Sequence, residues 1–205
     1  MHRKRYLVGW SGFTPGGEDE HHFMKAGFTV LGMLLFSAKC IAQTSFDQNH
    51  TAWNTLLKKH VVVAEAGKSS RVRYAGFAAD RVQLRGYLEA LSAVPEGEFN
   101  RWDRPQQMAF LLNAYNAFTV EKILTRYPNI KSIRDFGSIF GNPWKDRFFK
   151  LLGRESWLDR VEHDLLRAKG IYDEPRVHFA LNCASIGCPM LREEAYIGSR
   201  LDVQL

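Results

Sequence analysis

A histidine, an amide and two thiols lie close together near the C-terminal end of the chain, in the segment RVHFALNCASIGCPML. Its alternating apolar residues predict a short strand, with His178 and Asn182 on the face opposite the apolar side chains. Cys183 follows at once and begins a turn of small residues that ends at Cys188. A thiol beside a histidine, at the end of an apolar element, is a place where a cysteine nucleophile could be assembled.

Three chemistries are compatible with this segment. In a thiol-dependent hydrolase or acyltransferase, Cys183 would be the nucleophile, His178 or His163 its base, and Glu162 the group that orients the base. In a redox protein, Cys183 and Cys188 would form an exchanging pair. In a binding or scaffold domain without turnover, the same two cysteines would form a structural disulfide.

Glu162 and His163 lie in a predicted helix whose apolar stripe is formed by Leu158, Val161 and Leu165. At 100° per residue, Glu162 falls inside the stripe and His163 at its flank. A carboxylate that faces a core must be paired or protonated. Glu162 could therefore orient a histidine, or it could tie a loop to the core through an arginine or a buried backbone amide.

Asn113 and Asn116 share one face of another predicted helix, among apolar side chains. Buried amides need partners for both their oxygen and their nitrogen. Asn113 or Asn182 could serve as the polar stabiliser of a reaction. The alternative, which the general behaviour of buried amides favours, is that Asn113 and Asn116 clamp an irregular backbone such as residues 130–144.

The elements that would hold these residues are predicted from apolar periodicity and from helix-terminating residues. Asp80 is a plausible helix cap, Pro105 suits a first helical turn, and Ser156 begins a capping-box pattern. The predicted elements are a helix leading into a strand over residues 46–63, a short strand around 72–74, a helix over 80–91, a long helix over 105–127, a strand over 148–152, a helix from 156 to about 168, the strand over 177–181, and the start of a helix over 193–205. This order predicts an α+β fold, a helix-rich single domain around a small β-sheet.

The N-terminal region resembles a secretory signal peptide. Residues 24–42 combine a Met-Lys start, an apolar run that is short for a membrane span, and small residues before Gln43. We therefore expect a disordered upstream extension over residues 1–23, a signal peptide over 24–42 and the folded domain over 43–205. The protein would be periplasmic or secreted, with no stable membrane span after cleavage of the signal.

Composition and charge narrow the classes of partner. The chain has 45% hydrophobic and 24% charged residues, which is a globular composition. Its formal charge of +6 falls to +4 without residues 1–42, too little to indicate nucleic-acid binding. The partner is expected to be an unknown substrate or protein.

Neither a cofactor nor a metal is predicted. Phosphate-binding and dinucleotide-binding glycine motifs are absent from the sequence. His163, His178, Cys183 and Cys188 could supply four zinc ligands, but they lack the paired spacing of familiar zinc sites. Zinc therefore stays an outside alternative.

The order of several long motifs is similar to that of the DUF547 family, a domain of unknown function. The motifs are RYAGF, FLLNAYNAFTVEKILTRYP, KSIRDFG, PWK, SWLDRVEHDLLR and RVHFALNCASIGCPMLREEAY. The resemblance covers about residues 53–205 and is typical of an exported bacterial member. Family members usually continue further, so the resemblance implies that this chain lacks a C-terminal helical part.

The resemblance also implies a set of signature residues: Asn113, Tyr115, Asn116, Glu162, His163, His178, Asn182, Cys183, Cys188 and Pro189. Eukaryotic relatives carry the domain beside glutaredoxin-like, DEP or coiled-coil segments, which is compatible with thiol chemistry. A papain- or transglutaminase-like fold is an analogy from the Cys, His and Asn set alone.

Overall fold

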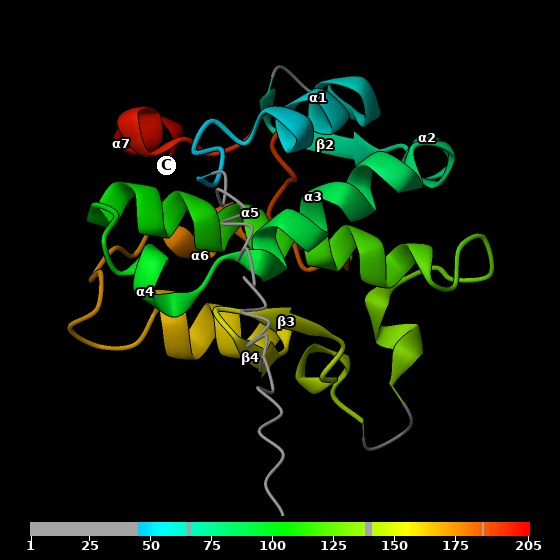
Figure 1. Ribbon diagram of the computed structural model, residues 1–205. Helices are drawn as coiled ribbons and strands as arrows, with labels where there is room; N and C mark the ends of the chain where they lie inside the picture. The colour runs from blue at the N-terminus through cyan, green and yellow to red at the C-terminus, as the bar shows by residue number, and fades with distance from the viewer. Residues whose placement is uncertain (1–44, 65–66, 138–140, 186) are drawn as a thin grey trace, which may run out of the picture. The chain divides into compact units, whose positions relative to one another are not determined.

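The computed structural model describes residues 45–64, 67–137, 141–185 and 187–205. All of them belong to one of the two units into which the chain divides, Gln43–Leu205. The predicted upstream extension and signal peptide lie outside the described residues. Figure 1 shows the arrangement of the helices and strands in this unit.

The elements are helices of very different length and two β-hairpins. In chain order they are α1 (Thr51–His60), β1 (Val61–Ala64), β2 (Ser69–Val72), α2 (Tyr74–Ala79), α3 (Arg81–Ala93), α4 (Glu96–Phe99), α5 (Arg104–Leu124), η2 (Ile133–Phe136), η3 (Pro143–Lys145), β3 (Phe149–Leu151), β4 (Arg154–Ser156), η4 (Arg160–Leu166), α6 (Val177–Ala180), η5 (Gly198–Arg200) and α7 (Leu201–Gln204). The predicted α+β class is confirmed.

Helix α5 is the central element of this unit. Asp103 caps its N-terminus by accepting a hydrogen bond from the backbone of Gln106, whose side chain bonds back to Asp103. Such a reciprocal pair satisfies two amides that the first helical turn leaves open. Every residue from Met108 to Val120 is buried, because α5 is packed by α2, α3, η4 and η5. The long helix is therefore confirmed, but it is enclosed on all sides rather than along one stripe.

The β-structure of the described residues consists of two antiparallel hairpins. Strands β1 and β2 pair with Val61 opposite Val72, and β3 pairs with β4 with Phe149 opposite Ser156. The β3–β4 turn places Gly153 at φ 76°, in the region that glycine adopts without steric cost. The predicted helix-to-strand unit at the start of the domain and the strand at β3 are confirmed.

Two predicted boundaries need correction. The second short strand ends at Val72, and Tyr74 begins α2 instead of extending that strand. The helix expected from Ser156 contains the π-helical segment η4, whose N-cap is Asp159 and has no side-chain capping bond. The Ser156 hydroxyl instead donates to the carbonyl of Arg154 and accepts from the Arg160 guanidinium.

The strand predicted over residues 177–181 is wrong, since residues 177–180 form the one-turn helix α6. Val177 and Ala180 are buried, three residues apart, which is the spacing of one helical face. Phe179, expected to face inward with Val177, is 71% exposed. A helical turn buries apolar side chains of this segment as well as a strand would. Five residues are too few to distinguish the helical period of 3.6 from the strand period of 2.

The last part of the chain is largely irregular before it ends in η5 and α7. Helix was expected from residue 193, but the structure has it only over Gly198–Gln204. The buried side chain of Gln204 links α7 to the irregular segment before η5. Its amide oxygen accepts a hydrogen bond from the backbone of Ile197, and its nitrogen donates one to the carbonyl of Ala195. Figure 1 shows α7 on the same side of α5 as α1.

Candidate functional site

Two asparagines of α5 fix the irregular C-terminal segment to the core. Asn113 donates from Nδ2 to the carbonyl of Tyr196 at 2.8 Å and accepts from the amide of Tyr196 at 3.0 Å. Asn54 of α1 supports the same stretch by accepting from the amide of Ala195 at 3.1 Å. Side-chain amides thus replace the strand partner that this backbone lacks.

Asn116, one turn along α5, holds the segment that carries the cysteines. Its Nδ2 donates to the carbonyl of Ala180 at 3.0 Å, and its Oδ1 accepts from the amide of Asn182 at 2.9 Å. The expectation that Asn113 and Asn116 act as amide clamps is confirmed. The segment they clamp is different, since it lies at 180–196 instead of 130–144.

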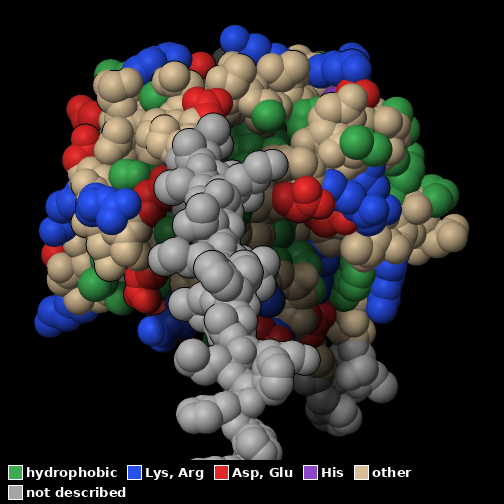
Figure 2. Space-filling model, in the orientation of Figure 1, with side chains coloured by type: hydrophobic (Ala, Val, Ile, Leu, Met, Phe, Trp, Pro, Cys, Tyr) green, Lys and Arg blue, Asp and Glu red, His purple; other side chains and the backbone are tan. Residues whose placement is uncertain are grey.

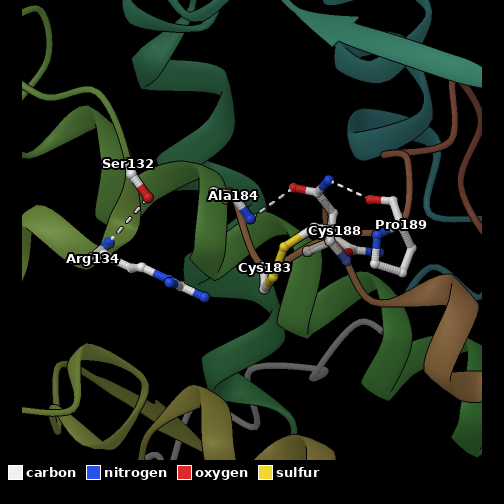
Figure 3. The surroundings of a disulfide bond; sticks show 8 residues. Ser132, Arg134, Cys183, Ala184, Cys188 and Pro189 are labelled. Carbon is white, nitrogen blue, oxygen red and sulfur yellow. Dashed lines mark hydrogen bonds between the residues drawn. A yellow bond between two sulfur atoms is a disulfide. The ribbon is translucent and has the colours of Figure 1, made fainter. Parts of the chain in front are cut away.

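The clamp continues through the Asn182 side chain into a disulfide-bonded loop (Figure 3). Asn182 donates to the carbonyl of Pro189 at 2.7 Å and accepts from the amide of Ala184 at 3.1 Å. Cys183 and Cys188 form a disulfide across Cα atoms 5.9 Å apart. Both cysteines are only partly buried, so the disulfide lies in a loop that solvent can reach.

A cationic side chain approaches the disulfide from η2. Figure 3 shows Arg134 pointing toward Cys183. The backbone of the two segments is also joined, because the amide of Ile133 donates to the carbonyl of Ala184 at 3.2 Å. A neighbouring guanidinium favours the thiolate over the thiol. The sequence reasoning missed Arg134, since nothing in its own spacing marks it as a neighbour of Cys183.

The two candidate bases do not bond to the cysteines. His178 is exposed on α6, and His163 is exposed on η4 with its Nε2 3.6 Å from the Asp159 carboxylate. In the described part of the chain, neither imidazole forms a hydrogen bond with either cysteine sulfur. With Cys183 in a disulfide, the structure is that of the oxidised protein, and the catalytic roles of these residues stay predictions.

Glu162 lies at the packed side of η4 without being deeply buried. Its carboxylate pairs with Arg167 at 3.0 Å, which matches the arginine-paired alternative drawn from the sequence. Burial, together with the charges of Glu162 and Asp159, raises the pKa of Tyr115 well above its ordinary value. Tyr115 therefore stays a neutral phenol beside two carboxylates, and Glu162 orients no histidine in the described structure.

The residues considered for zinc are not brought together. Over residues 45–64, 67–137, 141–185 and 187–205, no three side chains of His, Cys, Asp or Glu gather as a metal site would require. Helices long and apolar enough to cross a bilayer are likewise absent from these ranges. On the face shown in Figure 2, basic side chains are interspersed with acidic ones and form no continuous patch.

A second cluster of polar side chains, formed by Lys59, His60 and Asp80, joins α1 to the start of α3. The sequence reasoning did not identify this cluster. The Asp80 carboxylate lies 2.7 Å from Nε2 of His60 and 2.6 Å from Nζ of Lys59. Asp80 was predicted only as a helix cap, and its side chain makes no capping bond. Because twenty residues separate His60 from Asp80, only the packing of the helices shows that they meet.

Comparison with known protein families gives one match. The model for a "Protein of unknown function, DUF547" matches residues 99–205, from the end of α4 through α5, η4 and the disulfide loop to α7. The matched part therefore contains Asn113, Asn116, Asn182 and both cysteines. No curated protein and no solved structure matches the chain.

Proposed function

The chain belongs to the DUF547 family of proteins of unknown function, and from that premise we propose that Cys183 and Cys188 form a thiol–disulfide exchange site in an exported protein. The observation that carries the proposal is the position of the disulfide. It closes a partly exposed loop between two residues, Asn182 and Pro189, that are hydrogen-bonded to each other. The loop ends therefore have a link that does not depend on the disulfide.

That second link is what an exchange site needs. A disulfide stabilises a fold mainly by restricting the unfolded chain, so the native arrangement of the loop must be held by other contacts if it is to survive reduction. Here Asn116 and Asn182 already hold the loop to α5 and to itself. Breaking the S–S bond would release two thiols without releasing the loop, so the reduced and oxidised forms can share one fold.

The exchange proceeds in two steps and involves a dithiol partner. A partner thiolate attacks one sulfur of the disulfide and forms a mixed disulfide, while the other cysteine leaves as a thiolate. The second partner thiol, once deprotonated, attacks the mixed disulfide and displaces the remaining cysteine. The protein gains two electrons and two protons, and the partner is oxidised to its own disulfide. Arg134 would stabilise the thiolate that leaves in the first step.

An oxidising compartment is part of the proposal. Disulfides persist in the periplasm and outside the cell and are rare in the cytosol. The signal-like residues 24–42 and the Cys183–Cys188 bond both support a periplasmic or secreted location. Fusion of residues 1–45 to a reporter enzyme that is active only after export would test this location, with a fusion lacking residues 24–42 as control.

The thiol-dependent hydrolase or acyltransferase is a separate prediction, and it applies to the reduced protein. It requires His178 or His163 to reach Cys183 once the S–S bond is broken. Rapid alkylation of Cys183 near neutral pH in reduced protein, slowed by His178→Ala or His163→Ala, would support it. Alkylation at the rate of a model thiol in all three proteins would count against it.

The exchange proposal is tested by the rate at which glutathione reduces the disulfide. Alkylation and intact mass report the fraction reduced over time. We expect measurable reduction in the wild type and slower reduction in Arg134→Gln. The matched control is Lys131→Gln, which removes the same charge from an exposed position of the neighbouring loop. A disulfide that resists excess glutathione would instead favour a structural disulfide in a binding or scaffold domain. Equal rates of reduction in both variants would contradict the role of Arg134.

A further inference from the structure

A pocket far along the chain from the cysteines has the features of a ligand site. It lies among the end of α1, the end of β2 and the start of α2, with a volume of about 640 Å³. That size is within the usual range of small-molecule sites. Its lining residues are Lys59, His60, Val72, Arg73, Tyr74, Ala75, Gly76 and Tyr127. The family match begins only at residue 99, after all of these except Tyr127.

His60 is the buried polar group of this pocket. Only 5% of the residue is exposed, and its Nε2 is hydrogen-bonded to Asp80. A hydrogen bond from Lys59, and then one from His60, lowers the pKa of Asp80, so this carboxylate stays ionised and accepts only. Nε2 must then carry a hydrogen, and in the neutral tautomer that has its hydrogen there the Nδ1 lone pair is an acceptor.

The Nδ1 atom of His60 lies against Gly76, a residue that lines the pocket, and is not completely sealed from solvent. It makes no hydrogen bond to another described residue, yet it is not among their buried unpartnered atoms. His50 differs in this respect, because its Nε2 is sealed from solvent without a partner. The close approach of Nδ1 is possible only because residue 76 is glycine, since a Cβ there would overlap Nδ1.

The rest of the pocket combines apolar surface with a cation. Tyr74 and Tyr127 lie with ring centroids 6.3 Å apart, and burial raises the pKa of Tyr74 to about 12, so its hydroxyl is neutral. Lys59 is paired with Asp80. The guanidinium of Arg73 forms no ion pair with another residue in the part of the chain that the structure describes, so it is available to an anion.

We propose that this pocket binds a small anion that carries a hydroxyl group on an aromatic ring or short apolar chain. The hydroxyl donates to His60 Nδ1, the anionic group pairs with Arg73, and the apolar part lies against Tyr74 and Tyr127. The pocket shares no residue with the disulfide loop, so this inference does not depend on the exchange proposal.

The test uses 4-hydroxybenzoate as a probe, with NMR detection of the His60 imidazole in the full-length chain. Two comparison probes each remove one feature: benzoate lacks the hydroxyl, and 4-hydroxybenzyl alcohol lacks the charge. We expect 4-hydroxybenzoate to shift the His60 signals and to bind about fivefold more tightly than either comparison probe, the factor for one hydrogen bond of about 1 kcal/mol.

Two variants have matched controls in the same region. Gly76→Ala should displace His60 and abolish binding, whereas Gly86→Ala, at an open position of α3, should not. Arg73→Gln should weaken binding severalfold, whereas Arg71→Gln removes the same charge outside the pocket and should not.

Each outcome bears on the proposal. Loss of binding in Gly76→Ala and Arg73→Gln, with both controls unchanged, supports it. The absence of any shift at His60 up to about 10 mM probe, roughly ten times a dissociation constant of 1 mM, overturns it. Equal binding of all three probes also overturns it. If Gly76→Ala does not fold, the proposal is tested by the probe-induced shifts in the wild type and by the comparison of Arg73→Gln with Arg71→Gln.

Discussion

Replacing Asn113 by alanine should destabilise the protein strongly. Asn113 is 1% exposed, and its amide group makes two hydrogen bonds to the backbone of Tyr196. Alanine removes both bonds and leaves a buried N–H and a buried C=O without partners. Each lost bond costs about 1 kcal/mol, and orphaned buried groups add to this. We expect a decrease of about 3 kcal/mol in the free energy of unfolding.

Urea denaturation measures this decrease as a lower midpoint with an unchanged slope. For a domain of this size, about 3 kcal/mol corresponds to a fall of roughly 9 °C in Tm. Hydrogen exchange adds a local readout, because the Tyr196 amide should lose protection while amides of β3 keep theirs. The control is Asn129→Ala at an exposed position, expected to change the free energy by less than about 0.5 kcal/mol.

A loss below about 1 kcal/mol in Asn113→Ala, with the Tyr196 amide still protected, would refute the clamp. That result would mean that the backbone of residues 195–196 finds another hydrogen-bond partner. The clamp matters beyond stability, because its second half, at Asn116 and Asn182, is the reason we expect the disulfide loop to survive reduction.

Three further predictions concern the same domain. Removing the disulfide with Cys183→Ala and Cys188→Ala should lower the free energy of unfolding by about 2 kcal/mol, from the entropy of a six-residue loop; urea denaturation with circular dichroism should still show a cooperative transition. Asn182→Ala should cost the oxidised protein about 2 kcal/mol, for two lost hydrogen bonds, and unfold the loop of the reduced protein; the Cys188 amide, which bonds to the carbonyl of Ser185, should exchange faster only after reduction. Burial lowers the pKa of His50 from 6.5 to about 4, so between pH 6.5 and pH 4 only the unfolded state binds a proton at this residue. The free energy of unfolding should therefore be highest above pH 6.5 and fall by up to about 3 kcal/mol toward pH 4. Denaturation curves of His50→Gln should lack this part of the pH dependence.

Elements with local signals could be predicted from the sequence. Helix α5 has a capping residue at Asp103, a proline at its first turn and Pro128 after its end, so both boundaries follow from neighbouring residues. Buried amides at Asn113 and Asn116 were also predicted, since both share a face with apolar residues. Their clamp role follows from the need of any buried amide for partners.

The partners themselves were beyond sequence reasoning. The contacts of Asn113 and Asn116 lie 64 to 83 residues away in the chain, and no local pattern encodes such a pairing. The π-helical conformation of η4 and the helical turn at α6 were also not predicted, for a related reason. Helix α6 is four residues long, about one helical turn, and η4 is seven, too few for a pattern to separate one kind of helix from another. Both are anchored in the core by a fully buried valine, Val161 or Val177. Arg134 and the His60–Asp80 pair are likewise visible only after folding.

The redox equilibrium of Cys183 and Cys188 tests the central claim most directly. Wild-type protein is equilibrated in glutathione buffers of stepped potential, and alkylation followed by intact mass gives the reduced fraction at each step. An exchange site should titrate with a midpoint at or above about −270 mV, the lower end of the range of known exchange proteins. A pair that remains fully oxidised below about −300 mV would behave as a structural disulfide and would contradict the account.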